Sequence, residues 1–240
     1  MKVAVVIPAR LNAKRFPRKV LARDTGKYLV EHVYERVARW KGAERVLIAT
    51  DSAEVQAACR SFGANVVMTS EAHVSGTDRV AEVAAGLDHD VIINVQADEP
   101  LIEHDDLAAL VELFGDDVVM TTLASRRTDP EGFRDPNNVK AVVGRGQNAL
   151  YFSRSAVPYA AGEPLEWLQH IGIYAYRRRF LLELSRMEPT PLEKRERLEQ
   201  LRVLENGYRI RLGVSPHRHL GIDTAEEYRA FVEEYLAAKR

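Results

Sequence analysis

The 240-residue sequence has very little cysteine, no long apolar run and almost no net charge, and each absence excludes a class of protein. Its single cysteine, Cys59, cannot form an internal disulfide or a cysteine-rich metal site, so a reducing cytoplasm is the expected location. No apolar run approaches the roughly 20 residues needed to cross a bilayer, and the first residues lack the features of a signal peptide. Because the net charge is -1, any site for a polyanion must be local.

Two nucleotide-binding motifs are missing as well. No Gly-x-Gly-x-x-Gly turn follows the first apolar segment, which argues against a dinucleotide-dependent oxidoreductase. The GxxxxGK[ST] pattern is also absent, which disfavours a P-loop ATPase. Apolar residues make up 46% of the chain and charged residues 29%, without a repeat or a flexible linker. This composition predicts one globular domain over residues 1–240.

The order of the apolar segments in the first half predicts an α/β fold. Residues 3–8 form a continuous apolar run that ends in proline, which is typical of a strand buried on both faces of a parallel sheet. Helical spacing and further strand-like runs then alternate through residues 29–37, 45–50, 52–62, 65–68, 78–87 and 91–95. We expect a single doubly wound, mainly parallel sheet. In such sheets ligands bind at the carboxyl ends of strands, here after Ile7, Met68 and Val95.

The second half contains an irregular middle segment. Strands are predicted at 118–124, 139–143, 149–154, 172–176 and 208–214, and helices at 180–186, at 192–205 and from Thr224 onward. The connections between them are less regular than in the first half.

A basic segment follows the first predicted strand. Five cationic side chains occur between residues 8 and 19, namely Arg10, Lys14, Arg15, Arg18 and Lys19. A nucleotide triphosphate at the end of this strand would need its negative charge offset there. From the charge count alone, a basic loop that faces water is an equally good interpretation.

Two carboxylates are candidates for a magnesium site. Asp98 follows a buried strand, and Mg²⁺ prefers oxygen ligands, of which the protein usually supplies few. Asp98 could instead be a turn residue at the end of the strand. Asp223 is the second candidate, although it could also cap the helix that begins near Thr224. Glu99 is less favoured, because successive residues of an extended strand point to opposite faces.

Several segments together carry a resemblance to a known family. Residues 7–19 contain the Pro-Ala-Arg and Arg-x-Pro-x-Lys patterns of sugar-nucleotide cytidylyltransferases, and His-Val-Ser-Gly-Thr-Asp-Arg at 73–79 matches a second motif of the CMP-Kdo synthetases. Similar segments follow at 94–100, 150–154, 170–174, 198–202 and 221–224, so the similarity covers nearly the whole chain. The sequence thus resembles the CMP-Kdo synthetases, or 3-deoxy-manno-octulosonate cytidylyltransferases. The resemblance implies a nucleotide-diphospho-sugar transferase-like fold and transfer of CMP from CTP to 3-deoxy-manno-octulosonate (Kdo), with release of pyrophosphate.

The same resemblance implies a set of site residues. It assigns catalysis to Lys19, Asp98 and Asp223, with Mg²⁺ held by Asp98 and Asp223. The nucleotide site would be formed by Ala9, Arg10, Arg15, Lys19, Ser75, Gly76 and Thr77. The sugar site would be formed by Gln96, Arg154, His170, Tyr174, Glu199 and Gln200. A homodimer built partly from residues 139–159 is also implied, with no nucleic acid polymer and no membrane as partner.

Several of these residues also have a purely structural interpretation. Ser75 or Thr77 can cap the helix that follows them. Arg154 can form a surface ion pair, His170 can be a satisfied, partly buried histidine, Tyr174 can belong to the core, and Glu199 and Gln200 can face solvent on a helix.

Two segments depart from the usual family pattern. Alanine occupies position 97, where the family usually has glycine, and Arg18-Lys19-Val20 replaces the usual Gly-Lys-Pro. The loss of a glycine restricts the loop if a positive φ is needed there. The nearest alternative functions are those of CMP-sugar synthetases for sialic acid or for amino-substituted Kdo. A nucleotide-binding protein without activity would be expected to lack a metal carboxylate or the triphosphate cations, which this chain retains.

Overall fold

The computed structural model describes residues 1–12, 15–161 and 165–239. Contacts group the chain into two compact units, Met1–Leu107 with His219–Arg240 (unit 1) and Ala108–Arg218 (unit 2). Unit 1 is therefore built from both ends of the chain. The expectation of one domain over residues 1–240 concerns independent folding and stays a prediction.

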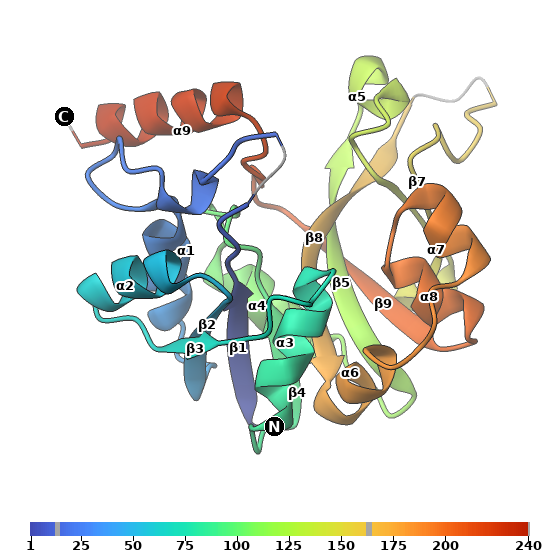
Figure 1. The fold of residues 1–240 in the computed structure, drawn as a ribbon. Coiled ribbons are helices and arrows are strands. Elements are labelled where there is room, and N and C mark those ends of the chain that lie inside the picture. Colours follow the sequence, from blue (N-terminus) through green and yellow to red (C-terminus); the bar gives the residue numbers. More distant parts are fainter. Residues whose placement is uncertain (13–14, 162–164, 240) are drawn as a thin grey trace. The chain divides into compact units, whose positions relative to one another are not determined.

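Unit 1 contains a four-stranded parallel sheet in the order β3-β2-β1-β4 (Figure 1). Its strands are β1 (Val3–Pro8), β2 (Arg45–Thr50), β3 (Val66–Met68) and β4 (Val91–Asn94). Every residue of β1 and β4 is buried. The prediction of buried central strands is confirmed, because continuous apolar runs satisfy both faces of a covered parallel sheet.

Three helices of unit 1 begin at a side-chain cap that the sequence supplies. The helices of this unit are η1 (Lys19–Leu21), α1 (Leu29–Ala38), α2 (Ala53–Ser61), α3 (Gly76–Ala85) and α9 (Ala225–Ala237), and α4 (His104–Glu112) crosses the boundary to unit 2. The hydroxyl oxygens of Ser52, Ser75 and Thr224 each accept a hydrogen bond from a backbone N–H of the helix that follows. The cap of α9 is Thr224, so the interpretation of Asp223 as that cap is wrong.

The C-terminal segment packs into unit 1 through an apolar cluster. Ile222, Tyr228 and Phe231 pack with Leu29 at the start of α1, and Phe16 packs against this cluster. The cluster joins the segment before α9 to the basic segment near the N-terminus. It therefore brings Asp223 to the same part of unit 1 as Lys19.

Unit 2 contains β5 (Val118–Arg127), β6 (Lys140–Val143), β7 (Ala149–Ser153), β8 (Trp167–Arg177) and β9 (Arg209–Ser215). Strand β5 pairs with β8 in antiparallel and with β9 in parallel orientation, and β6 pairs antiparallel with β7 and β8. Its helices are α5 (Pro130–Arg134), η2 (Arg145–Gln147), α6 (Arg178–Leu184), α7 (Pro191–Glu196) and α8 (Gln200–Glu205). The expected α/β class with a mainly parallel sheet is confirmed, and the structure adds the antiparallel pairs of unit 2, which were not predicted.

Some predicted boundaries in the second half are wrong. The helix expected over residues 192–205 is two helices, because Arg197 has a φ of 56° in the left-handed region and ends α7. Strand β8 starts before Gly172, and helices α4 and α5 were not predicted. The sequence offers no glycine at position 197 to indicate the break.

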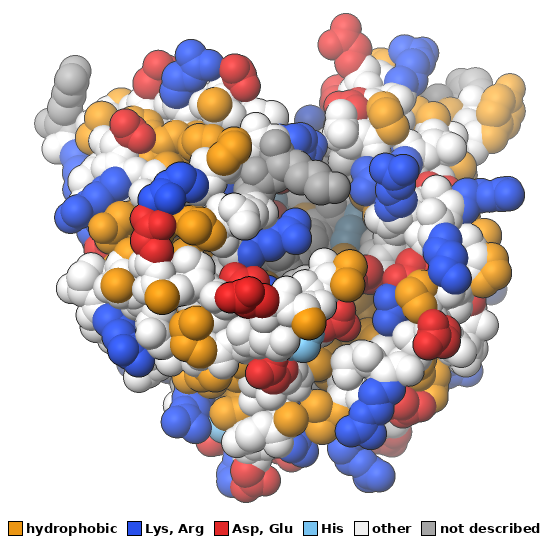
Figure 2. Space-filling model, in the orientation of Figure 1, with side chains coloured by type: hydrophobic (Ala, Val, Ile, Leu, Met, Phe, Trp, Pro, Cys, Tyr) orange, Lys and Arg blue, Asp and Glu red, His pale blue; other side chains and the backbone are white. Residues whose placement is uncertain are grey.

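No helix in the described ranges is long and apolar enough to cross a membrane. On the face drawn in Figure 2, Lys and Arg side chains are interspersed with Asp and Glu side chains, in keeping with the net charge of -1.

Candidate active site

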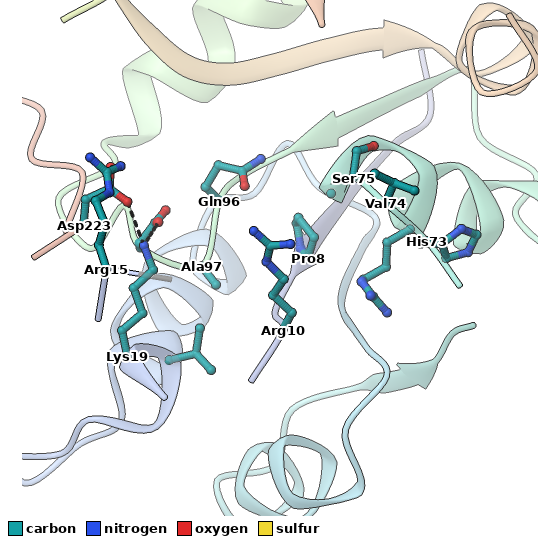
Figure 3. A pocket seen from close by; sticks show the side chains of 14 residues that line it. Pro8, Arg10, Arg15, Lys19, His73, Val74, Ser75, Gln96, Ala97 and Asp223 are labelled. Atoms are coloured by element: carbon teal, nitrogen blue, oxygen red, sulfur yellow. Dashed lines mark hydrogen bonds and ion pairs between the residues drawn. The ribbon is translucent and has the colours of Figure 1, made fainter. Parts of the chain in front are cut away.

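A pocket of about 370 Å³ lies in unit 1 beyond the carboxyl ends of β1 and β4 (Figure 3). The predicted residues that line it are Arg10, Arg15, Lys19, Ser75, Gly76, Gln96, Asp98 and Asp223. Lys19, Arg15 and Asp223 lie at one end, His73, Val74 and Ser75 lie at the other, and Arg10 lies between them (Figure 3). The structure therefore brings together most of the nucleotide and metal residues expected from the sequence.

The Lys19 ammonium connects the two predicted metal carboxylates. Its Nζ atom lies 2.5 Å from Asp98 Oδ2 and 3.1 Å from Asp223 Oδ1, and it donates a third hydrogen bond to the Ile222 carbonyl at 2.8 Å. Lys19 is buried, with 9% of its surface exposed. A buried ammonium needs such acceptors, because burial without partners strongly disfavours the charge.

The charges at this cluster depend on one another. Burial alone would lower the pKa of Lys19, but the charges and hydrogen bonds of Asp98 and Asp223 raise the pKa above its ordinary value. Lys19 is therefore a permanent cation at neutral pH. Burial raises the pKa of Asp98, and the neighbouring Asp223 carboxylate adds to this effect, whereas Lys19 opposes it. Any additional positive charge that enters the pocket would thus stabilise the ionised form of Asp98.

The other predicted cations occupy different situations. Arg15 Nη2 lies 2.6 Å from Asp223 Oδ2. Arg10 is exposed and has no hydrogen bond or ion pair with any described residue, so its guanidinium is available to a ligand. Arg18 is paired with Glu54 and does not line the pocket. The fifth cation of the segment, Lys14, lies outside the described residues.

The expectation about the Gly-Lys-Pro departure concerns Arg18. Its φ is 62°, so this arginine adopts the left-handed conformation that favours glycine. Ala97 is buried against the pocket, and its φ is not positive. The alanine therefore adds a methyl group without backbone strain, whereas the arginine carries the strain.

The opposite end of the pocket is formed by the start of α3. The Ser75 hydroxyl accepts from Asp78 N at 3.1 Å, so Ser75 is the cap of α3 and Thr77 is not. A Cβ atom at Gly76 would lie 3.5 Å from Pro8 Cγ, which shows that the helix start and the end of β1 approach closely. Of the other predicted residues here, Ala9 is completely buried and Thr77 is buried in the first turn of α3.

Arg79 was not predicted, yet it supports this end of the pocket. Its guanidinium is almost completely buried, and it donates to Asp51 at 2.6 Å and to the Thr69 hydroxyl. It thereby ties α3 to the segments that follow β2 and β3. The signal available in the sequence was its place in the 73–79 motif.

Glu99 lies nearer to this cluster than the strand argument implied. Strand β4 ends at Asn94, and the chain then turns, with Glu99 N donating to Gln96 O. The premise that Asp98 and Glu99 extend a strand is therefore wrong. Burial, with the Asp98 and Asp223 charges, raises the pKa of Glu99 to about 8, and its Oε2 atom has no partner in the described part of the chain. Glu99 is thus mostly protonated at neutral pH.

In unit 2, three predicted sugar residues lie around one strand. His170 and Tyr174 are on β8, with ring centroids 5.4 Å apart, and the Tyr174 hydroxyl lies 3.5 Å from Gln200 Oε1. Gln200 is buried, and its Nε2 atom has no partner among the described residues. Burial lowers the pKa of His170 to about 3, so the ring is neutral at neutral pH. Buried donors of this kind are normally satisfied, and an unsatisfied one indicates a place for a ligand or water.

Glu199 is near these residues, and Gln96 is placed separately. Glu199 is the residue before α8, and its charge adds to the burial that raises the pKa of Tyr174. The expectation that Gln200 could face solvent is wrong, since it is 3% exposed. Gln96 belongs to unit 1, where its Nε2 atom donates to Asn94 Oδ1 at 2.9 Å.

Arg154 is held by contacts that the sequence did not predict. Its Nε atom donates to Glu196 O and its Nη1 atom to Pro136 O, both at 2.9 Å, and its backbone N donates to Glu196 Oε2. Lys140 is completely buried and donates to the Arg154 carbonyl at 2.7 Å. The surface ion-pair interpretation of Arg154 is therefore wrong, because its side chain is fixed by backbone carbonyls.

The described residues contain no group of three or more His, Cys, Asp or Glu side chains that could hold a metal. The pair Asp98 and Asp223 is of the size that Mg²⁺ uses, since this ion is commonly bound by one or two carboxylates together with substrate phosphates. Both side chains are partly exposed to the pocket, 24% and 45% respectively. Their oxygens fit the ion.

Comparison with known proteins gives consistent matches. The cytidylyltransferase family matches residues 4–210. The 3-deoxy-manno-octulosonate cytidylyltransferase of Geobacter metallireducens is 47% identical, with 98% of each chain covered. That of Solibacter usitatus is 46% identical, with 94% of this chain and 91% of the relative covered.

Solved structures agree with these relatives. A CMP:2-keto-3-deoxy-manno-octonic acid synthetase complexed with CTP has a TM-score of 0.93 and 37% identity, and all of both chains is covered. A nucleotidyl transferase from Methanothermobacter, 15% identical with a TM-score of 0.67 over 99% of both chains, shares the fold alone.

Proposed function

The chain belongs to the cytidylyltransferase family and, within it, to the 3-deoxy-manno-octulosonate cytidylyltransferases, and from this premise we propose that it joins CMP from CTP to Kdo. The anomeric hydroxyl of the sugar attacks the α-phosphorus of CTP and loses its proton to water, the new O–P bond forms, and the bond to the leaving pyrophosphate breaks. The product, CMP-Kdo, serves lipopolysaccharide synthesis.

One observation carries this proposal. A single pocket contains the Lys19 ammonium between Asp98 and Asp223, together with the exposed guanidinium of Arg10 and that of Arg15. A triphosphate with its metal ion needs this combination of cations and carboxylates. Phosphoryl-type transfer depends mainly on alignment and charge stabilisation, so no serine or cysteine nucleophile is required.

The residues of the pocket have different roles in the proposed reaction. Arg10 and Arg15 bind the triphosphate, and Arg15 can exchange its ion pair with Asp223 for a phosphate contact. Lys19 orients both carboxylates and stabilises charge on the leaving group. The start of α3 at Ser75 and Gly76 contacts the cytosine through backbone groups, since the Ser75 hydroxyl already caps the helix.

Asp98 and Asp223 would hold Mg²⁺, which would neutralise the triphosphate and polarise its phosphoryl oxygens. The raised pKa of Asp98 supports this role, because a carboxylate disfavoured by burial is stabilised when a cation binds it. Before the ion binds, the raised pKa of Glu99 keeps this side chain from adding a third negative charge beside the two aspartates.

The sugar would be bound by Arg154, His170, Tyr174, Glu199, Gln200 and Gln96. Kdo presents one carboxylate and several hydroxyl groups, and these residues offer a cation, neutral donors and acceptors. The buried and unsatisfied Nε2 atom of Gln200 supports this assignment, because a ligand oxygen would satisfy it. We further propose that the protein is cytoplasmic and forms a homodimer through the segment around residues 139–159.

Pyrophosphate release tests the function directly. The protein is incubated with CTP, Mg²⁺ and one of four sugars, namely Kdo, an amino-substituted Kdo, sialic acid or a neutral hexose. We expect CTP with Kdo to give the highest kcat/KM. A higher value with sialic acid would move the protein to another group of CMP-sugar synthetases.

The metal assignment is tested with Asp98→Asn, which keeps the shape of the side chain and removes its charge. We expect turnover to fall by about 10² to 10³, the loss typical of one preorganised electrostatic contact. The fully exposed Asp88 provides the matched control, since Asp88→Asn should retain parental turnover. Near-parental kcat of Asp98→Asn at saturating Mg²⁺ would exclude Asp98 from the metal site.

A further inference from the structure

The pairing of β5 with β8 contains an irregularity beside the predicted sugar residues. Thr122 pairs with Tyr174, but the next residue, Leu123, pairs with Ile171, so Gly172 and Ile173 have no counterpart on β5. A bulge of this kind leaves backbone groups outside the regular ladder. The Thr122 hydroxyl satisfies carbonyl groups at the bulge, since its Oγ1 atom lies 2.8 Å from Ile173 O and 3.3 Å from Ile171 O.

The same hydroxyl lies 3.0 Å from Nε2 of His170. A threonine hydroxyl has one proton to donate, and a backbone carbonyl can only accept. The short contact to Ile173 O therefore takes the hydroxyl proton, and only lone pairs of Oγ1 face His170. Since two such atoms at this distance repel unless a proton lies between them, Nε2 of His170 must carry the proton.

This fixes the chemistry of the other ring nitrogen. His170 lies deep in unit 2 although part of its surface is accessible, and desolvation lowers its pKa to about 3, so the ring is neutral at neutral pH. A neutral imidazole protonated at Nε2 has an acceptor at Nδ1. Nδ1 has no hydrogen-bond partner in the described ranges. The ring is held edge-on against Phe152, with centroids 4.9 Å apart.

We propose that Thr122 is a specificity-determining positioning residue that fixes the Nε2–H tautomer of His170. The Nδ1 atom of His170 then accepts a hydrogen bond from a sugar hydroxyl. This inference rests on the sugar-binding role of His170 in the proposed function. Thr122 acts through His170 and does not itself contact the sugar. His170 then recognises a hydroxyl donor and rejects a carboxylate at the same position. The carboxylate of the sugar must accordingly be met by donors such as Arg154.

Two substitutions at Thr122 separate the hydroxyl from the shape of the side chain. Thr122→Val removes the hydroxyl with little change of volume, and Thr122→Ser retains it. Thr121 supplies a matched control on the same strand, because its hydroxyl donates to Leu110 O at 2.7 Å and is hydrogen-bonded to no histidine in the described part of the chain. Thr121→Val therefore removes a similar buried hydrogen bond without touching His170.

The tautomer is measured by ¹⁵N NMR, because a protonated and an unprotonated ring nitrogen have well-separated shifts. The chain has seven histidines, so the His170 signals are assigned as those that disappear in His170→Asn. We expect an Nε2–H ring in the parent protein, in Thr121→Val and in Thr122→Ser. In Thr122→Val we expect a mixture of tautomers. The KM for Kdo should then rise roughly tenfold, the size of one lost hydrogen bond, while the dissociation constant of CTP stays unchanged.

Adding Kdo to the parent protein gives a second test that does not depend on any variant folding. The Nδ1 resonance should shift and the Nε2 resonance should remain. A parent ring protonated at Nδ1 overturns the proposal. So does Thr122→Val with the parental tautomer, or with an altered tautomer and an unchanged KM for Kdo. If the parent protein releases no pyrophosphate with Kdo, the proposed function fails, and the tautomer measurement still shows separately whether Thr122 fixes the ring.

Discussion

Replacing Lys19 with methionine tests whether its ammonium holds the two acidic side chains of the pocket in place. Methionine retains the length and the apolar stem of lysine and removes all three hydrogen bonds, to Asp98, Asp223 and the Ile222 carbonyl. The variant leaves Asp98 buried without its cation. The free energy of unfolding should therefore fall, in addition to any effect on catalysis.

The size of the loss follows from the burial of the partners. Breaking a buried ion pair by removing one member costs about 3–5 kcal/mol. Water screens part of this, because the Asp98 and Asp223 side chains are 24% and 45% exposed, so we expect about 2–3 kcal/mol. For a chain of this size, that corresponds to a decrease in Tm of roughly 4–12 °C.

The assay is a double-mutant cycle followed by thermal and urea unfolding. Asp98→Asn in the Lys19→Met background removes the unpaired charge and should recover most of the lost stability, while turnover stays low. Lys27→Met is the control, because Lys27 forms a 2.5 Å ion pair with Glu35 in which the side chains are 30% and 33% exposed. We expect Lys27→Met to lose no more than about 1 kcal/mol.

Two results would refute this reasoning. One is a Lys19→Met protein as stable as the parent, which would mean that the ammonium is not an internal partner of Asp98. The other is a double variant less stable than Lys19→Met, because the cycle would then show that the two substitutions do not relieve one another. CTP binding measured by calorimetry in each variant separates these effects from nucleotide recognition.

Three further predictions concern backbone strain, a buried lysine and pH. Arg18→Gly should be about 1 kcal/mol more stable to urea than Arg18→Ala, since both lose the ion pair but only glycine relieves the left-handed φ of 62°; equal stabilities would contradict the strain. Lys140→Met should lower the free energy of unfolding by about 3 kcal/mol, because three backbone carbonyls lose their donor, whereas the exposed Lys194→Met should change it little. Burial lowers the pKa of His32 in the folded protein to about 4, so as the pH falls His32 is protonated in the unfolded chain before it is protonated in the folded one. The free energy of unfolding should therefore decrease as the pH drops from 6.5 toward 4. At pH 5 this difference in pKa lowers the free energy of unfolding by about 2 kcal/mol. Between pH 7 and pH 5 the His32→Gln variant should therefore lose about 2 kcal/mol less stability than the parent protein. Identical pH profiles would exclude His32 as the source of the pH dependence.

The sheet of unit 1 could be predicted because its strands are marked by composition alone. Val3–Pro8 and Val91–Asn94 are continuous apolar runs, and the structure buries every residue of both. Ser75 was one of two predicted caps of α3, the other being Thr77, and its hydroxyl caps that helix in the structure. Strands and helix caps that depend on a local sequence pattern could therefore be predicted from the sequence.

Other features depended on contacts that no local signal contains. The chain turns after Asn94, so the rule that neighbouring residues alternate between faces did not apply to Asp98 and Glu99. Arg197 breaks the helix expected over 192–205, although arginine is a good helix former. The fixation of Arg154 depends on Glu196 and Lys140, which are distant in sequence from one another. Only the tertiary structure reveals such partners.

The roles of the site residues rest on the family and on their grouping in space. The Lys19, Asp98 and Asp223 cluster is explained by the hydrogen bonds described above, and these contacts could not be deduced from spacing along the chain. The motifs contain several of the residues that line the pocket. Their assignment to nucleotide, metal and sugar is tested by the experiments proposed here.

The Lys19 hydrogen bonds also have a consequence for the order in which the chain is made. Lys19 is 79 positions from Asp98 and 204 positions from Asp223, and the whole of unit 2 is translated between the two aspartates. A ribosome adds about 5–20 residues per second, so a growing chain contains Lys19 and Asp98 for many seconds before Asp223 is synthesised. During that time the pocket also lacks Ile222, Tyr228 and Phe231 of its supporting cluster. The pocket is therefore among the last parts of the protein to be completed, because a nascent chain lacks Asp223 until all of unit 2 has been synthesised.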